Sequence, residues 1–144
     1  MTRKEKWEQR YYRIQRRIVP DLKYSQTTYE ELLTQTVTGG IDWLEAGCGH
    51  QVLPEWRLAQ ERSLVARCRR VVGVDLDGEG IQKHRTIKET YYANLESLPL
   101  EAESFDLVTC NMVVEHLAAP EQVFKEFHRV LRPGGRVIIH TPNA

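Results

Sequence analysis

The residues best suited to chemistry stand where a short apolar segment runs into glycines, in the stretch WLEAGCGHQ from Trp43 to Gln51. The simplest interpretation is a buried strand that turns sharply through Gly47 and Gly49 into a helix. Glycines allow positive φ angles and let a bound molecule lie against bare backbone, and a following helix offers free N–H groups. We therefore predict a ligand site at this turn.

A second apolar run, RVVGVDL at residues 70–76, contains an acid near its end, Asp75. An acid about 20 to 25 residues beyond a glycine turn is expected when the next parallel strand places a carboxylate against a pair of ribose hydroxyls. An ionised carboxylate accepts two such hydrogen bonds and repels a 2′-phosphate. The alternative role for Asp75 is to cap the next helix, although Asp77 could serve there instead.

Four segments, taken in order, resemble the blocks of the class I S-adenosylmethionine-dependent methyltransferases, in particular the group called methyltransferase type 11. They are EAGCG at 45–49, VDL at 74–76, SFDLV at 104–108 and RVLRPGG at 129–135. The resemblance covers residues 41–142. A GxG turn alone also occurs in NAD-binding folds, so the order and spacing of the four blocks carry the resemblance.

The resemblance implies S-adenosylmethionine as the cofactor and assigns its contacts. Glu45 and the backbone at Gly47 and Gly49 would hold the methionine portion. Asp75 would take the ribose hydroxyls, and Leu76 would flank the adenine. Two further pairs would read the adenine amino group and line the pocket near the transferring methyl. The full predicted set is Glu45, Ala46, Gly47, Cys48, Gly49, Asp75, Leu76, Asn94, Leu95, Asn111 and Met112.

Candidate catalytic residues follow the fourth predicted strand. His116 is a candidate general base for O-methylation, because its unperturbed pKa lies near neutrality, and Glu115 precedes it. A packed histidine satisfied by backbone is the alternative, and the role of His140 is open. No carboxylate and histidine set has metal spacing, so we predict no metal. The sequence lacks an NPPY or DPPY motif and a Pro-Cys nucleophile, which argues against methylation of nucleobase amino groups, glutamine or cytosine C5.

The elements that position these residues follow from hydrophobic periodicity. We predict helices over 3–18, from 25–28 to 37, and over 54–69, 78–88 and 121–131, and strands over 41–46, 70–76, 90–95, 105–111 and 136–141. With the resemblance, this predicts a Rossmann-like, doubly wound, mostly parallel α/β sheet of order 3-2-1-4-5. Residues 1–40 would form N-terminal helices that pack on or cap the S-adenosylmethionine-binding domain, 41–144, within a single domain overall.

The family's usual last two strands are lacking, which would leave the fifth strand as a bare edge. We expect either a fragment of a longer protein, which is the favoured interpretation, or a minimal domain whose edge is covered. The N-terminal helices or a partner copy in a homodimer could cover it.

Charge is distributed unevenly although the formal net charge of the 144 residues is zero. Residues 3–17 hold seven basic and two acidic side chains, so the remaining 13 basic and 18 acidic side chains differ by minus five. Trp7, Tyr11, Ile14 and Ile18 fall at helical spacing in this basic segment. The segment could be a lid or a contact for an anionic substrate or nucleic acid. The favoured interpretation is a solvated helix whose aromatic side docks on the domain.

Composition sets the remaining expectations. The chain has no apolar run long enough to span a membrane and a charged start, so we predict a cytoplasmic protein with no membrane partner. Zero net charge argues against nucleic acid as a partner. Cys48, Cys68 and Cys110 are predicted to be reduced thiols.

The predicted function is methyl transfer from S-adenosylmethionine to oxygen, nitrogen or carbon of a small-molecule acceptor. One alternative is a cofactor-binding module without activity of its own, working as a subunit or regulatory domain. A second is an NAD-dependent oxidoreductase, against which the missing GxGxxG spacing and the RVLRPGG block argue.

Overall fold

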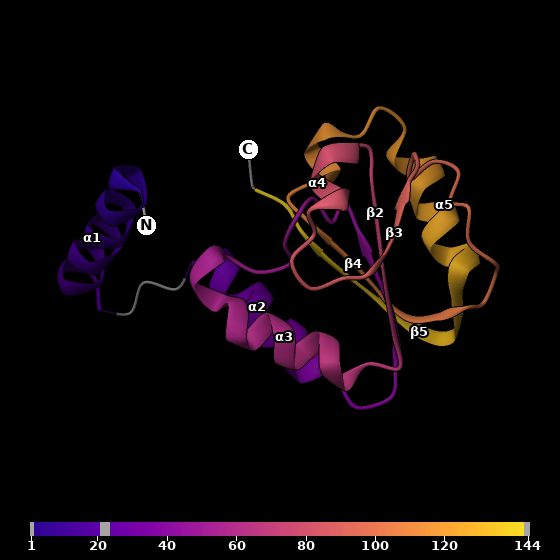
Figure 1. The fold of residues 1–144 in the computed structure, drawn as a ribbon, viewed down its shortest axis with the longest axis horizontal. Helices are drawn as coiled ribbons and strands as arrows, with labels where there is room; N and C mark the ends of the chain where they lie inside the picture. The colour runs from indigo at the N-terminus through magenta and orange to yellow at the C-terminus, as the bar shows by residue number, and fades with distance from the viewer. Residues whose placement is uncertain (1, 21–23, 143–144) are drawn as a thin grey trace.

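The computed structural model describes residues 2–20 and 24–142. Five parallel strands form one sheet in the order β3-β2-β1-β4-β5, which confirms the predicted topology (Figure 1). The strands are β1 (Asp42–Ala46), β2 (Arg70–Asp75), β3 (Glu89–Tyr92), β4 (Phe105–Asn111) and β5 (Leu131–His140). All five residues of β1 are buried, as expected for the central strand of a sheet covered on both faces.

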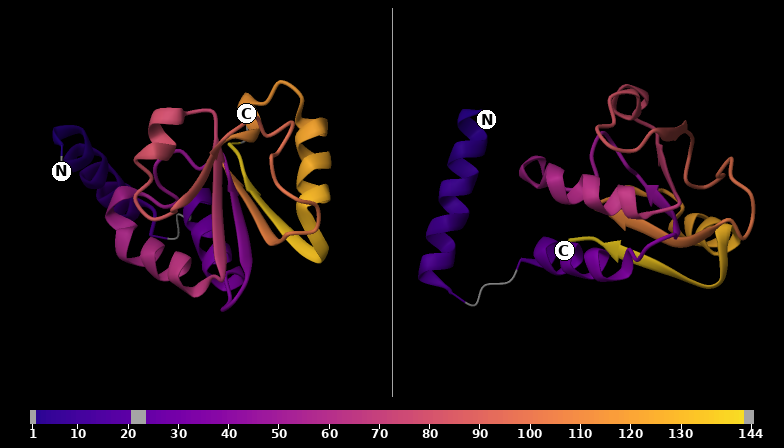
Figure 2. Two further views of the ribbon diagram at one scale, coloured as in Figure 1. Left: turned by 45° about the vertical axis from the view of Figure 1, so that its right-hand side comes forward. Right: turned by 60° about the horizontal axis from the view of Figure 1, so that its bottom comes forward.

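Helices cover the two faces of the sheet (Figures 1 and 2). They are α2 (Ser25–Thr36), α3 (Leu58–Arg67), α4 (Gly78–Gln82) and α5 (Pro120–Val130), with short 3-10 turns η1 (Glu55–Arg57) and η2 (Val114–His116). The remaining described helix, α1 (Arg3–Ile18), does not cover the sheet. The neighbouring residues Trp43 and Leu44 of β1 belong to the two separate cores. Trp43 packs in the core with α2 and α3, and Leu44 packs in the core with α5. This alternation follows from the period of two along a strand.

Three elements differ from the predicted bounds. The helix expected over 54–69 starts as η1 and becomes α-helical only at Leu58. The helix expected over 78–88 ends after one turn, because glycine is a poor helix former and the His84 ring accepts hydrogen bonds from the amides of Thr86 and Ile87. The third strand occupies 89–92, not 90–95, so Asn94 and Leu95 follow it.

The RVLRPGG block also differs from its predicted structure. It was expected to close a helix before a strand over 136–141, yet β5 already begins at Leu131, which pairs with Phe105. A register shift between Phe105 and Leu107 and the positive φ of Gly134 (81°) accommodate the proline and glycines inside the strand.

Arg132 of this block, together with Arg69, fastens the end of the sheet remote from the glycine turn. Arg132 donates to the carboxylates of Asp42 (2.8 Å) and Asp106 (3.0 Å). Arg69 binds Asp42 through two nitrogens, at 2.9 and 2.5 Å. Hydrogen bonds from Arg69, opposed by burial and aided by Arg132, lower the pKa of Asp42 to about 2. Arg132 of the motif is therefore structural.

The two N-terminal helices behave differently. The predicted helix α2 buries one side, because Tyr29 and Leu33 are buried with Val37, whereas Leu32 is 47% exposed. The prediction that the aromatic side of α1 docks on the domain is wrong, since its apolar side chains are exposed. Figure 2 shows α1 standing apart from the sheet and the helices that cover it. None of the described helices is long and apolar enough to cross a membrane.

Candidate functional site

The glycine turn lies at the carboxyl end of β1, next to the end of β2. Gly47 and Gly49 have φ of 74° and 50°, the left-handed region that glycine adopts without strain. The amides of Gly47 and Cys48 both donate to the carbonyl of Val74, at 2.8 and 3.1 Å, so the turn is closed onto β2. The predicted strand, sharp turn and positive φ angles are thus present.

Asp75 bridges the turn and the start of α4. Its Oδ2 accepts the Gly49 amide and its Oδ1 accepts the Asp77 amide, each at 2.8 Å. Asp77 in turn caps α4 by accepting the Gly80 amide at 2.9 Å, so the capping role falls to Asp77. A carboxylate has about four acceptor positions, so each oxygen of Asp75 keeps capacity for a hydroxyl group.

These features fit the cofactor that the fold family implies. A Cβ atom built on Gly49 would meet nothing within 4 Å, so the space beside this glycine is open. Leu76 and Tyr92, at the ends of β2 and β3, are 58% and 69% exposed and offer apolar surface beside Asp75. Tyr92 was not predicted as a site residue, although its position at the end of a strand was a usable signal.

The pair predicted to read adenine lies just beyond Tyr92. Asn94 is exposed, and its Oδ1 accepts the Glu96 amide at 3.0 Å, which leaves the side-chain oxygen one further acceptor position. Leu95 is only 6% exposed and belongs to the core under α5, as does the buried Ala46. The side chain of Leu95 therefore has a packing role in this structure.

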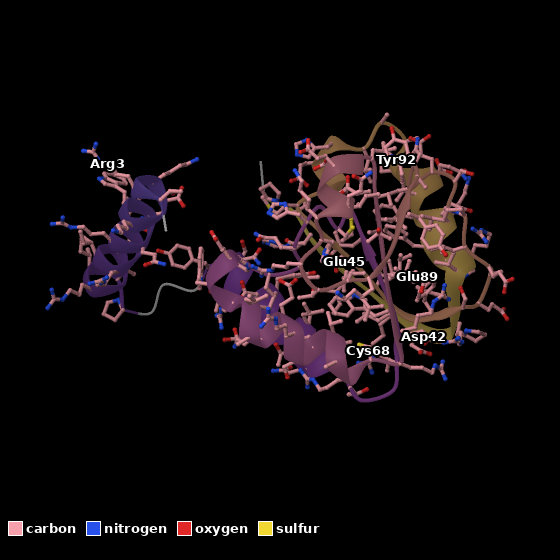
Figure 3. The ribbon with its side chains drawn as sticks, in the orientation of Figure 1. Arg3, Asp42, Glu45, Cys68, Glu89 and Tyr92 are labelled. Carbon is pink, nitrogen blue, oxygen red and sulfur yellow. The ribbon has the colours of Figure 1, made fainter. Side chains whose placement is uncertain are left out.

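Glu45 is a buried acid beneath the glycine turn. It is 2% exposed, and the Thr109 hydroxyl donates to it while accepting the Trp43 indole N–H at 2.7 Å. Burial, against the opposing hydrogen bond from Thr109, raises the pKa of Glu45 to about 8. Burial and then the nearby Glu45 carboxyl raise the pKa of Cys48 to about 12, so this thiol is not a nucleophile. Figure 3 places Glu45 near the centre of the sheet.

Helix α2 closes the side of the site over β4 and β5. His140 on β5 hydrogen-bonds Asn111 Oδ1 through Nδ1 (2.7 Å) and Ser25 Oγ through Nε2 (2.9 Å), and it stacks on Tyr29. Because an amide oxygen only accepts, Nδ1 carries a proton and donates to Asn111, and Nε2 is left to hydrogen-bond with the Ser25 hydroxyl. The Tyr29 hydroxyl is buried without a hydrogen-bond partner among the described residues. Burial and then Glu45 raise the pKa of Tyr29.

A cavity of about 690 Å³ lies where α1, α2 and η1 face the ends of β4 and β5. Its lining includes Trp56, Met112 and His140. A smaller cavity of about 410 Å³ adjoins it and includes Gln51 and Asn111. The predicted pair Asn111 and Met112 therefore lies at these cavities. The other predicted cofactor residues, at the ends of β1 to β3, do not line them.

A buried ion pair fixes the loop that forms one wall of both cavities. Glu61 of α3 is fully buried and accepts hydrogen bonds from the amide of Leu53 (2.9 Å), the hydroxyl of Thr86 (2.6 Å) and the guanidinium of Arg85. Arg85 also donates to the carbonyls of Leu53, Pro54 and Glu55. This anchor was not predicted, because 24 residues separate the two partners.

The predicted catalytic pair lies away from the cavities. The His116 side chain is 79% exposed, with Nε2 3.8 Å from Glu115 Oε1, and Glu115 accepts the Thr141 hydroxyl at 2.9 Å. The hydrogen bond from its own backbone, with the bond from Thr141, lowers the pKa of Glu115. The structure instead brings His140, whose role was open, to the cavity wall. Among the described residues no cluster of His, Cys, Asp or Glu could hold a metal ion.

The fold and the site together define a class of protein. An open parallel sheet with order 3-2-1-4-5, a glycine turn after its first strand and an acid ending its second is a Rossmann-like α/β protein whose ligand side is the carboxyl edge. Figure 3 shows the two ends of the sheet: Tyr92, at the carboxyl end of β3, is labelled above Glu89 and Asp42, which begin β3 and β1.

Comparison with known proteins identifies the family. Residues 44–139 match the family model described as a methyltransferase domain. The chain therefore belongs to the class I S-adenosylmethionine-dependent methyltransferases. The match is to a methyltransferase family, whereas the alternative considered from the sequence was an NAD-dependent oxidoreductase.

Individual relatives and solved structures are also named as S-adenosylmethionine-dependent methyltransferases. The chain is 38% identical over 108 residues to a probable S-adenosylmethionine-dependent methyltransferase of Mycolicibacterium smegmatis, covering 72% of this chain and 39% of that protein. It is 34% identical over 137 residues to one from Mycobacterium tuberculosis, covering 88% and 47%. The crystal structure of an S-adenosylmethionine-dependent methyltransferase from Mesorhizobium loti superposes with a TM-score of 0.62 at 23% identity, covering 78% and 53%. The chain thus spans less than half the length of these two curated relatives.

Proposed function

We propose that the chain carries the cofactor site and one wall of the acceptor site of a methyltransferase that acts on a small molecule. The observation that carries this proposal is the cavity of about 690 Å³ at Met112 and His140, beside the family's cofactor edge. Pockets for drug-sized ligands typically measure about 300 to 1,000 Å³. An acceptor screen distinguishes methyl transfer to oxygen, nitrogen or carbon.

The cofactor would be held by groups whose geometry is described above. When bound, S-adenosylmethionine supplies an electrophilic methyl group on a sulfonium centre. Asp75 would accept the ribose hydroxyls, Leu76 and Tyr92 would flank the adenine, and the bare backbone at Gly49 would admit the methionine portion. Glu45 would lose its proton near a cationic amino group, because a neighbouring positive charge favours the ionised carboxylate.

The acceptor would occupy the cavity between α1, α2 and η1. Trp56 is 61% exposed there and offers a flat apolar face, while Met112 is 45% exposed at the end of β4. Such a mixture suits a molecule with an apolar or aromatic body. Methyl transfer then requires in-line alignment more than any covalent step by the protein.

His140 is better placed than His116 to accept a proton from a hydroxyl acceptor. Asn111 Oδ1 holds the proton of the ring on Nδ1, so in the neutral form Nε2 would be the basic nitrogen at the cavity wall. Ser25 lines the same cavity and hydrogen-bonds this nitrogen, so its hydroxyl would relay the proton from an acceptor to His140. A catalytic role for His116 and Glu115 remains a proposal, and the geometry supports it less, because neither residue lines the cavity.

The test is titration calorimetry of the 144-residue chain with S-adenosylmethionine and S-adenosylhomocysteine, followed by an acceptor screen that detects S-adenosylhomocysteine. We expect binding that Asp75→Ala abolishes and Glu121→Ala preserves, since Glu121 is an exposed carboxylate that pairs with Lys125 on α5. Undiminished binding by Asp75→Ala, or none by the folded chain, contradicts the proposed site. Binding without turnover across the acceptor panel supports the non-catalytic alternative.

The prediction of a homodimer concerns the edge of β5. Within the described sheet β5 pairs only with β4, and Val137 and Ile139 are 40% and 38% exposed on one side of the strand. An edge with exposed β-branched residues favours pairing with another chain. Light scattering behind gel filtration tests this, with Ile139→Lys expected to yield monomer if the edge forms the interface.

A further inference from the structure

Helix α1 turns its apolar stripe away from the rest of the protein. Trp7, Tyr11, Ile14 and Ile18 are 69%, 47%, 48% and 74% exposed. At about 100° per residue, these four positions fall within an arc of about 60° on the helix surface. A helix that helps to cover a core has its stripe buried, so the stripe of α1 does not cover the core of the described residues.

The opposite side of α1 faces the body of the protein. Glu8, Gln9 and Arg13 line the large cavity, and Gln15 accepts the Tyr24 hydroxyl at 2.5 Å. By the same angular count, Gln9 and Arg13 lie on the side of the helix opposite the stripe, and Glu8 and Gln15 lie between that side and Tyr11. The helix thus makes polar contacts inward and leaves an aromatic and aliphatic surface outward. Figure 3 shows side chains on several sides of α1, with nitrogen-tipped ones on the side remote from the domain and Arg3 at one end.

Basic side chains flank this outward stripe. Lys6, Arg10 and Arg17 are exposed on one flank, and Lys4 is exposed on the other. The two acids of residues 3–17 fall away from the stripe at helical spacing. Residues 3–17 carry a formal net charge of plus five, and the remainder of the chain carries minus five. An anionic surface would therefore attract α1 and repel the remaining protein, which orients the molecule.

We propose that α1 is an in-plane anchor that binds a lipid bilayer bearing anionic headgroups. The stripe would insert at the boundary between headgroups and acyl chains, with Trp7 at the interface and the flanking Lys and Arg side chains at the phosphates. The sequence predicted no membrane partner because it lacks an apolar run long enough to span a bilayer. A helix that lies in the plane of the bilayer needs no such run. The cavity behind α1 would then face the bilayer from which an apolar molecule could enter.

Two other partners fit the stripe less well. Nucleic acid would use the basic side chains, but the aliphatic Ile14 and Ile18 add nothing to phosphate contacts and cannot stack on bases as aromatic rings do. A second copy of the chain would bring the same row of positive charges face to face, which is unfavourable. Charge complementarity therefore favours the lipid surface.

The test is flotation of the 144-residue chain with vesicles of phosphatidylcholine alone or with about a third phosphatidylglycerol, whose negative charge should attract the helix. We expect binding to the anionic vesicles only, weakening as salt rises. The double variant Lys6→Gln/Arg10→Gln should bind roughly thirtyfold more weakly, at about 1 kcal/mol per basic residue. The matched control Lys83→Gln/Lys125→Gln removes two charges elsewhere and should bind as the unaltered chain does.

Two further measurements separate the apolar contribution and the rival partners. Ile14→Ser/Ile18→Ser should abolish flotation, and the emission of Trp7 should shift to the blue on binding in a Trp56→Phe background, since Trp43 is already buried. Circular dichroism checks that each variant is folded. The inference is overturned by equal binding to neutral vesicles, by no flotation, by a dimer that these serine variants dissociate, or by RNA binding with no vesicle binding. None of these readouts depends on methyl transfer, so they leave the proposed function untouched.

Discussion

Replacing Arg85 by methionine should destabilise the protein strongly, because it leaves the Glu61 carboxylate buried without its cation. Glu61 is fully buried and the Arg85 side chain is 18% exposed. Removing one partner of a buried ion pair costs about 3 to 5 kcal/mol. Glu61 keeps the Leu53 amide and the Thr86 hydroxyl as donors, so we expect the lower value, about 3 kcal/mol.

That loss is large beside the total stability of a domain, about 5 to 15 kcal/mol. At the size of this chain it corresponds to a fall in Tm of roughly 10 °C. The assay is equilibrium urea unfolding followed by far-UV circular dichroism and tryptophan fluorescence, with the m-value compared between variants. Coincident transitions by the two probes establish that the unfolding free energy is well defined.

A matched control and a double variant make the prediction specific. Lys83→Met removes an exposed cation from the same loop, whose partner Glu79 is also exposed, and should cost less than about 0.5 kcal/mol. Glu61→Met/Arg85→Met removes both charges and should be more stable than Arg85→Met, because no buried charge is left unpaired. The reasoning fails if Arg85→Met costs no more than Lys83→Met, or if the double variant is the less stable of the two.

The pH dependence gives the same pair a second signature. Hydrogen bonds from Arg85, Thr86 and the Leu53 amide overcome burial and lower the pKa of Glu61 below its ordinary 4.5. Its stabilising contribution is therefore present above pH 4.5 and is lost as the pH falls through the lowered pKa. In Arg85→Met burial dominates, so acidification should stabilise this variant relative to the unaltered chain.

Three further predictions concern other groups. Because burial raises the pKa of Glu45 to about 8 from an ordinary 4.5, the folded state holds a proton that the unfolded chain releases, so unfolding free energy should fall as pH rises between these values. Glu45→Gln should remove this slope in urea titrations, and an unchanged slope would refute the assignment. Asp42, with its pKa lowered to about 2 from 3.8, contributes stability above pH 3.8 that is lost as pH falls towards 2. Asp42→Asn should cost roughly 1 to 2 kcal/mol at neutral pH and flatten the acid limb of the same titration, whereas an acid limb identical to that of the unaltered chain would contradict the prediction. Once an acceptor with a hydroxyl is found, His140→Gln should lower kcat roughly a hundredfold and His116→Gln by less than about twofold, and the reverse ranking in steady-state assays would restore His116 as the base.

Much of the fold was predictable because its signals are local. The strand 41–46, the turn through Gly47 and Gly49 and the acid Asp75 follow one another along the chain, and local apolar runs and glycine preferences encode them. The strand order came from the family resemblance and is confirmed by the pairing. Errors fell on element ends, as at residues 78–88, where the His84 ring accepts the Ile87 amide and the helix stops at Gln82.

The side chains that shape the site were harder to predict, because their partners are distant in sequence. Arg85 pairs with Glu61 across 24 residues, and His140 meets Ser25 across 115. No spacing rule connects such residues, since only the packed sheet brings them together. The same holds for α1: its periodicity predicted an amphipathic helix, but a pattern of apolar residues does not state which way the apolar side turns.

The sequence by itself therefore determined the class of the protein, since the glycine turn, the acid after it and the family blocks are written in consecutive residues. Tertiary structure alone decided three matters. It placed His140 and not His116 at the cavity, it buried Glu61 against Arg85 beneath the loop of residues 53–56, and it turned the apolar stripe of α1 outward. Each of these depends on which surfaces come into contact when the sheet and helices pack. The order of residue types along the chain does not specify those contacts.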